Sequence, residues 1–235
     1  IQNGTIAPGG NAGPTGTTQF WRNAWVGLGG GFGDVRLGRI LMPLQDQNGG
    51  YDAFDTGTVG TVHTGGPSAT VRANSAIYYR TPNLGGLFVH AAIAAGEGQT
   101  PALPTSERPI GFAVGYAAGP LSVSFAYDKN AADLKSTGLY GKYNLGFMTL
   151  MGQYEDSDTS ATTDRKDMSI SASIPMGSGR IMAGILRTDP SVGVTLTKIG
   201  LGGEYNLSKR TLLYTDFGKV KNAKAMFDIG VRHAF

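Results

Sequence analysis

The chain has 235 residues, of which 40% are hydrophobic and 16% are charged, and its formal net charge is +3. This composition is too apolar for a disordered chain and too polar for a bundle of membrane helices. The absence of cysteine excludes disulfides and thiolate metal sites. The 37 glycines show no Gly-X-Y period, which excludes collagen. An all-β chain with many tight turns explains the glycine content best.

The first part of the chain is predicted to consist of strands on either side of one long connection. Residues 40–70 have neither helical nor strand periodicity, and an irregular segment of this length is usually functional or disordered. We predict that this loop folds into a barrel and narrows a pore, with its carboxylates facing arginines across a gap. The charged residues concerned are Asp46, Asp52 and Asp55 on the loop and Arg36, Arg39, Arg72 and Arg80 on the flanking strands.

Further along the chain, alternation of apolar and polar residues predicts a series of β-strands. The pattern holds at 110–116, 121–128, 168–174 and 199–205, and it is cleanest at 227–235. Because successive side chains of a strand point to opposite faces, each strand has one apolar and one polar face. Counted in this way, about thirteen strands are expected, each close to the ~9–11 residues that cross a bilayer when tilted.

The predicted connections are of two kinds, short ones rich in turn residues and longer polar ones, and the two kinds alternate. This is the arrangement of an outer-membrane barrel, whose turns are short on one side of the membrane and long on the other. A soluble sandwich has no reason to separate its loops in this way. The short connections are expected at 29–33, 82–86, 117–120, 144–146, 176–179 and 206–210, and the long ones at 40–70, 96–109, 128–136, 155–166, 187–195 and 219–224.

The polar faces of the strands favour a water-filled interior, because they hold mostly Gly, Ala, Ser and charged residues. A soluble sandwich would instead fill its core with bulky side chains from two sheets. We therefore predict an all-β fold, a transmembrane antiparallel β-barrel that forms a single domain over 1–235, with 40–70 folded into the lumen. Bacterial barrels close with an even number of strands. About thirteen strands thus predict a chain that lacks its first three strands, either truncated at its N-terminus or incomplete.

Four segments carry a resemblance to a known family: 22–39 (RNAWVGLGGGFGDVRLGR), 72–86 (RANSAIYYRTPNLGG), 205–222 (YNLSKRTLLYTDFGKVKN) and 230–235 (GVRHAF). Together they resemble the general-diffusion porins of Gram-negative bacteria, and most of all the beta-proteobacterial type. The resemblance implies a sixteen-stranded barrel in the bacterial outer membrane, assembled as a homotrimer, with the third loop as a constriction. It also implies an environment of outer-membrane lipid and lipopolysaccharide, and recognition of the terminal Phe235 by the barrel assembly machinery.

A pore does no covalent chemistry, so its functional site is an electrostatic field across a narrow opening. We expect Arg22, Arg72 and Arg80 to line the constriction, since porins of this type carry arginines on the fourth and sixth strands facing the third loop. Arg39 either joins them or anchors the root of the loop. Basic residues outnumber acidic ones about two to one on the predicted lumen face, which predicts passive diffusion of small hydrophilic solutes with a preference for small anions. The lumen face is expected to hold Arg22, Arg36, Arg72, Arg80, Lys142, Lys198, Arg210 and Arg232 as basic residues and Asp34, Glu204, Asp216 and Asp228 as acidic ones.

Each of these residues also has a simpler interpretation. A lumen arginine can be a solvated wall residue or half of a structural ion pair. The aspartates of the 40–70 loop can be ordinary turn residues, because aspartate bonds to its own backbone in turns. A second acidic cluster could hold a divalent cation, although a solvated loop is the simpler interpretation. That cluster consists of Glu155, Asp156, Asp158 and Asp164.

The sequence motifs of enzymes, metal sites and nucleotide-binding proteins are missing or incomplete. The histidines His63, His90 and His233 lie at no metal-ligand spacing, no G-x-S-x-G elbow occurs, and the glycines of 27–33 lack the G-x-G-x-x-G spacing. We therefore expect no enzymatic activity, no cofactor, no metal site and no nucleic-acid partner. The alternatives to a passive pore are a substrate-specific channel, a plugged structural barrel and a barrel enzyme such as a lipase.

Overall fold

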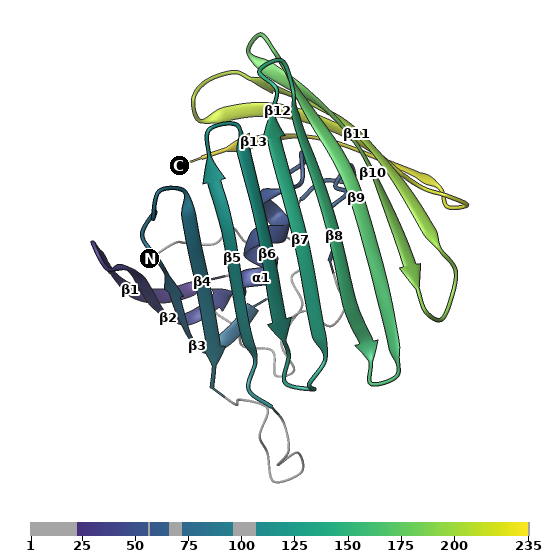
Figure 1. Cartoon of the computed structure of the whole chain (residues 1–235). Coiled ribbons are helices and arrows are strands. Elements are labelled where there is room, and N and C mark those ends of the chain that lie inside the picture. The colour runs from purple at the N-terminus through teal and green to yellow at the C-terminus, as the bar shows by residue number, and fades with distance from the viewer. Residues whose placement is uncertain (1–22, 56, 66–71, 96–106, 235) are drawn as a thin grey trace.

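The computed structural model describes residues 23–55, 57–65, 72–95 and 107–234. Within these ranges, thirteen strands form one antiparallel sheet in which each strand pairs with the next one along the chain, so the predicted all-β fold and strand number are confirmed. The sheet runs from β1 (Ala24–Gly30) to β13 (Ala225–His233), which form its two edges. It curves around a short helix, α1 (Pro43–Gly50), which lies on its concave side (Figure 1).

The remaining strands follow one another as antiparallel hairpins. No helix in the described part of the chain is long and apolar enough to cross a membrane. The strand bounds are β2 Gly33–Leu41, β3 Arg72–Arg80, β4 Leu87–Ala94, β5 Ile110–Ala118, β6 Leu121–Lys129, β7 Lys135–Asn144, β8 Thr149–Ser160, β9 Thr163–Met176, β10 Gly179–Pro190, β11 Leu196–Asn206 and β12 Thr211–Val220.

Each strand separates an apolar outward face from an inward face of small and polar residues. On β9, for example, Met168 and Ile170 are 53% and 65% exposed, whereas Ser169 and Ser171 between and beside them are buried. Large apolar side chains are exposed on nearly every strand. A soluble monomer rarely exposes so much contiguous apolar surface, and such a belt is typical of a barrel that faces lipid. The predicted orientation of the faces is confirmed.

The prediction of a long connection at 155–166 is wrong. β8 continues to Ser160 and β9 begins at Thr163, so the two strands form one long hairpin. The pattern hides these strands because both of their faces are polar here, where the hairpin extends beyond the apolar belt. The acidic cluster is therefore divided between faces: Glu155 is buried inward, while Asp156 pairs with Lys166 at 3.9 Å. Among the described residues, no group of acidic or histidine side chains could hold a metal ion.

Candidate functional site

The connection between β2 and β3 enters the interior of the curved sheet and begins with α1 (Figure 1). The prediction of an irregular loop over 40–70 is therefore wrong for this helix. Pro43 occupies the first turn, where a missing N–H costs nothing. The buried residues of the helix include Leu44 but also Gln47 and Asn48. A helix whose buried positions are partly polar has no apolar stripe, so its sequence shows no helical periodicity.

Apolar side chains of this loop pack onto small residues of the inner wall. Leu44 and Phe54 are almost completely buried, and burying a side chain of this size stabilises by about 1.5–3 kcal/mol. The small inward residues, which the sequence suggests for a water-filled lumen, thus form here the surface against which the loop packs. The three clusters are Met42 with Ile40, Ala73, Ala76, Tyr78, Ala92 and Ala94; Leu44 and Tyr51 with Ala113, Ala126 and Tyr140; and Ala53, Phe54 and Val62 with Met182.

Polar side chains of β8 hold the loop at its centre. Asn48 and Thr64 each donate a hydrogen bond to Oε2 of Glu155, at 3.0 and 2.9 Å. Gln153 accepts a hydrogen bond from the backbone N–H of Thr64 at 3.0 Å and donates to the carbonyl of Asn48 at 3.1 Å. Glu155 is completely buried. Its negative charge is therefore used to fix the loop and does not face the open lumen.

The tip of the loop reaches the opposite wall and rests on two glycines. A Cβ atom at Gly200 on β11 would overlap the carbonyl oxygen of Gly60, and one at Gly218 on β12 would overlap that of Val59. The backbone N–H of Val59 also donates to Asp228 on β13 at 3.1 Å. The loop thus crosses the interior from the wall of β4–β8 to that of β11–β13.

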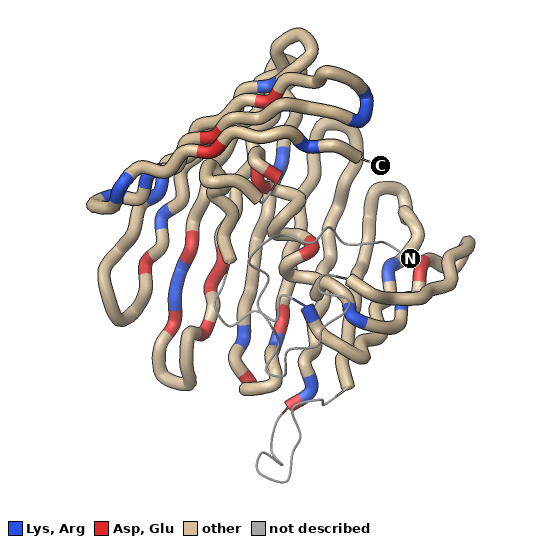
Figure 2. The backbone as a smooth tube through the Cα atoms, turned by 180° about the vertical axis from the view of Figure 1, so that it is seen from behind, with Lys and Arg blue, Asp and Glu red and all other residues tan. Residues whose placement is uncertain are grey.

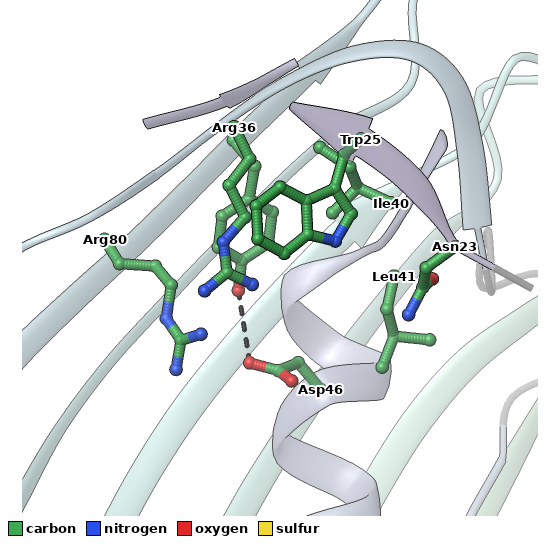
Figure 3. Close-up of a pocket in the computed structure, with 8 residues that line it drawn as sticks. Asn23, Trp25, Arg36, Ile40, Leu41, Asp46 and Arg80 are labelled. Carbon is green, nitrogen blue, oxygen red and sulfur yellow. Dashed lines mark hydrogen bonds between the residues drawn. The ribbon is translucent and has the colours of Figure 1, made fainter. Parts of the chain in front are cut away.

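A cavity of about 500 Å³ remains between α1 and the wall formed by β1, β2 and β3 (Figure 3). The guanidinium groups of Arg36 and Arg80 and the carboxylate of Asp46 point into the same space (Figure 3). Arg36 lies over the ring of Trp25 at 4.3 Å and pairs with Asp34. Among the described residues, no carboxylate lies within ion-pair distance of Arg80. The remaining lining residues are Asn23, Ile40, Leu41 and Tyr78.

Asp46 is held in place by the wall behind it. Tyr78 donates a hydrogen bond to its Oδ2 at 3.2 Å, and Nδ1 of His90 lies 3.5 Å from the same oxygen. Burial raises the pKa of Asp46, but the hydrogen bond with His90 and the charge of Arg80 outweigh this effect, so the pKa lies below its ordinary value. Asp46 therefore carries its negative charge at neutral and mildly acidic pH.

The lowered pKa of Asp46 predicts a pH-dependent contribution to stability. A carboxylate whose pKa is lower in the folded than in the unfolded protein stabilises fully above its unfolded pKa of about 3.9, and the contribution is lost as the pH falls through the folded pKa. We expect Asp46→Asn to lower stability by about 1 kcal/mol at pH 7, as for loss of one typical hydrogen bond. The measurement is the temperature at which the folded band disappears in detergent electrophoresis. A difference between wild type and variant that does not shrink as the pH falls below about 3.9 would contradict this role.

Arg39 and Arg72 lie outside the cavity, contrary to the prediction that they line the constriction. Arg39 donates to the Asn74 side chain, and Arg72 donates to Asn23 at 3.2 Å. For Arg72 the reason is a bulge, because the register shifts between the pair of Gly38 with Ala76 and the pair of Ile40 with Ala73. β3 has one residue more than β2 between these pairs, so Arg72 does not share the face of Arg80. Arg39 lies three residues after Arg36 on the same strand and therefore faces the opposite side. For Arg39, the alternative that it anchors the root of the loop agrees with this contact.

The other two loop aspartates do not face the predicted arginines. Asp52 is buried and accepts hydrogen bonds from Thr61 at 2.8 Å and from the backbone of Phe54 at 3.3 Å, so it is a turn residue. Asp55 pairs with Arg180 on β10, which the sequence analysis missed. Arg180 also pairs with Glu204 at 2.6 Å. The position of Arg180 in the sequence, one residue after a turn glycine, does not indicate that it pairs with the loop.

The remaining predicted lumen charges have different positions. Lys142 on β7 donates to the carbonyl of Gly50 at 3.2 Å, at the end of α1. Lys198 on β11 interacts electrostatically with Asp52. Asp216 on β12 is buried beneath the tip of the loop. Arg210 lies in the connection between β11 and β12, so its prediction as a wall residue is wrong.

The predicted two-to-one excess of basic groups on the inner wall is also wrong. Figure 2 shows lysines and arginines together with acidic residues along strands across the sheet. The inward faces include Asp128, Glu155 and Asp167, which are all but completely buried. What matters for a pore is therefore which charges face the open cavity. Arg22 and Phe235, predicted for the constriction and for assembly, lie outside the described residues.

Comparisons with known proteins agree with this architecture. The sequence family described as Gram-negative porin matches residues 3–225. Outer membrane porin protein 32 of Delftia acidovorans is 30% identical over 260 residues, which cover 92% of this chain and 74% of that protein.

Two solved structures have the same fold. The anion-selective porin from Comamonas acidovorans is 30% identical, with a TM-score of 0.79 over 92% of this chain and 78% of that one. The trimer form of OmpT from Vibrio cholerae is 17% identical, with a TM-score of 0.67 over 90% of this chain and 80% of that one. At this lower identity, the likeness to OmpT concerns the fold alone.

Proposed function

This chain belongs to the Gram-negative porin family of the bacterial outer membrane, and on that premise we propose that its channel selects for anions through the cavity between α1 and β1–β3. A porin conducts small hydrophilic solutes passively, driven by their concentration gradient. The preference for anions is supported by the arrangement of charges around the cavity. It is also supported by the similarity to a porin described as anion-selective.

The observation that carries the proposal is the unequal pairing of the charges at the cavity. Asp34 is paired with Arg36, and Asp46 accepts a hydrogen bond from Tyr78. The Arg80 guanidinium points into the same space without a carboxylate in ion-pair distance in the described part of the chain. A positive group with free hydrogen-bond donors beside a narrow aqueous opening attracts anions and repels cations.

The alternatives fit the structure less well. A substrate-specific channel would show a ladder of aromatic side chains along the lumen, but the described cavity lining holds only Trp25 and Tyr78. A plugged barrel would leave no opening, whereas a cavity with charged walls remains beside the loop. We propose no covalent chemistry for this chain, because its relatives are porins.

We propose assembly as a homotrimer, in keeping with the family resemblance. Outer-membrane lipid and lipopolysaccharide would cover the apolar outward face, which exposes large side chains on nearly every strand. Recognition of the C-terminal Phe235 by the barrel assembly machinery stays a prediction.

The zero-current potential in a planar bilayer tests the anion preference. We expect the protein, across a roughly tenfold KCl gradient, to give a potential with the sign set by chloride, because the exposed positive groups of the constriction concentrate anions. The potential should fall at high ionic strength, where salt screens the charges. A potential with the sign set by potassium would contradict anion selectivity, and absence of conductance would favour the plugged barrel.

A further inference from the structure

His90 lies on the inward face of β4, directly behind the carboxylate of Asp46. The side chain is almost completely buried, and its Nδ1 lies 3.5 Å from Oδ2 of Asp46, 3.1 Å from the Tyr78 hydroxyl and 3.4 Å from the Gln47 amide. The distances place one ring nitrogen among three polar groups. The ring can therefore accept a hydrogen bond when neutral and donate one to Asp46 when protonated.

The groups that face His90 come from each neighbouring element. α1 contributes Asp46 and Gln47, and β3 contributes Tyr78 together with Arg80, which is the cross-strand partner of His90. On β5, its cross-strand partner is the uncharged Ala113. On its own strand, the ring of Phe88 lies 5.1 Å away. Within the described ranges, the charged groups that face His90 are the carboxylate of Asp46 and the guanidinium of Arg80, and both line the cavity.

We propose that His90 is a further specificity-determining residue of the channel, whose protonation offsets the charge of Asp46 and strengthens the preference for anions at mildly acidic pH. The inference rests on the proposed channel function and adds a dependence on pH. His90 acts through Asp46, since the cavity lining includes Asp46 but not the imidazole.

The sign of the effect follows from the neighbours of His90. With a neutral imidazole, the Asp46 carboxylate partly cancels the positive field that Arg36 and Arg80 produce in the cavity. Protonation adds one positive charge beside that carboxylate. Asp46 itself remains ionised in this range, because its pKa is held below the ordinary value. Histidine is the side chain that ordinarily changes charge between about pH 5 and 8, so a change of selectivity in this window points to an imidazole.

The test is the zero-current potential of wild type, His90→Asn and His233→Asn at pH 8 and pH 5.5 across the same KCl gradient. For wild type, we expect the permeability ratio of chloride over potassium to rise about twofold on acidification, as for one added charge partly screened by water. His90→Asn should lose this rise. His233, whose Nδ1 lies 2.8 Å from the Thr211 hydroxyl at the end of β13, is the matched control, and its variant should keep the rise.

The outcomes separate this inference from the proposed anion preference. A wild type without a pH-dependent shift, or a His90→Asn variant that keeps the shift, overturns the role of His90 and leaves the anion preference intact. A wild type that selects cations at pH 8 but moves toward anions only when His90 is present overturns the anion preference and supports the role of His90. If His90→Asn does not fold, His90→Gln takes its place. A wild-type shift centred below about pH 5 would assign the effect to carboxylates and overturn the inference.

Discussion

Replacement of Arg80 by alanine should remove most of the anion preference of the channel. Its guanidinium points into the cavity beside α1, and no described carboxylate pairs with it. One unit charge a few ångströms from the path of an ion changes its energy by about 0.5 kcal/mol in a water-like dielectric with salt. Loss of the positive charge makes the channel less favourable for chloride and more favourable for potassium by this amount each. The chloride-to-potassium permeability ratio should therefore fall about fivefold. The measurement is the zero-current potential across a KCl gradient.

Arg187→Ala is the matched control for this experiment. Arg187 lies on the outward side of β10, its side chain is 59% exposed, and it pairs with Asp189 at 2.7 Å. The control removes the same charge from the same kind of strand but outside the lumen, so the potential should stay at the wild-type value. Equal potentials for Arg80→Ala and wild type would show that Arg80 does not set the selectivity.

The fold could be predicted because every strand of a barrel must present apolar side chains on its outward face. At 168–174, for instance, apolar side chains alternate with serines, and the structure shows the same alternation of more exposed and buried residues. The rule loses its force where both faces are polar. For this reason the hairpin of β8 and β9 was predicted as a long loop, although Ser160 and Thr163 belong to its strands.

The constriction could be predicted only in outline. Asp46, Arg36 and Arg80, three of the charged residues predicted for it, lie together at one cavity. The predicted position of Arg72 was wrong, because a face assigned by counting residues fails across a bulge. The positive φ of Ser75, +45°, lies within that bulge, and nothing in the residue type announces it.

The charge balance of the lumen was wrong for a different reason. Counting inward residues treats every carboxylate alike, but Glu155 is completely buried and accepts hydrogen bonds from Asn48 and Thr64. Such a residue stabilises the position of the loop and has little influence on an ion in water. The packing of the loop against the wall, which decides which charges remain exposed, depends on contacts between residues far apart in the chain. A sequence pattern of period two does not contain that information.

A larger side chain at Gly200 should release the tip of the loop from the opposite wall. Valine suits a β-strand, but its Cβ would overlap the carbonyl oxygen of Gly60, a backbone atom that cannot move unless the loop moves. Overpacking of this kind costs about 1–3 kcal/mol. We expect Gly200→Val to lower the temperature at which the folded band disappears in detergent electrophoresis. We also expect a higher single-channel conductance, because the displaced loop no longer narrows the lumen.

Gly141→Val is the control that separates this effect from a general cost of changing glycine on a strand. Gly141 lies on β7, where a Cβ atom would meet no other atom within 4 Å, so conductance and heat stability should both stay close to wild type. If Gly200→Val and Gly141→Val had the same conductance, the contact at Gly200 would not fix the width of the channel. If only the heat stability of Gly200→Val fell, the loop would be held in the lumen by its other anchors, namely the clusters around Leu44 and Phe54 and the hydrogen bonds to Glu155. A rise in conductance confined to Gly200→Val would therefore show that the position of the loop tip sets the width of the channel. The charges beside α1 would then determine which ions pass through it.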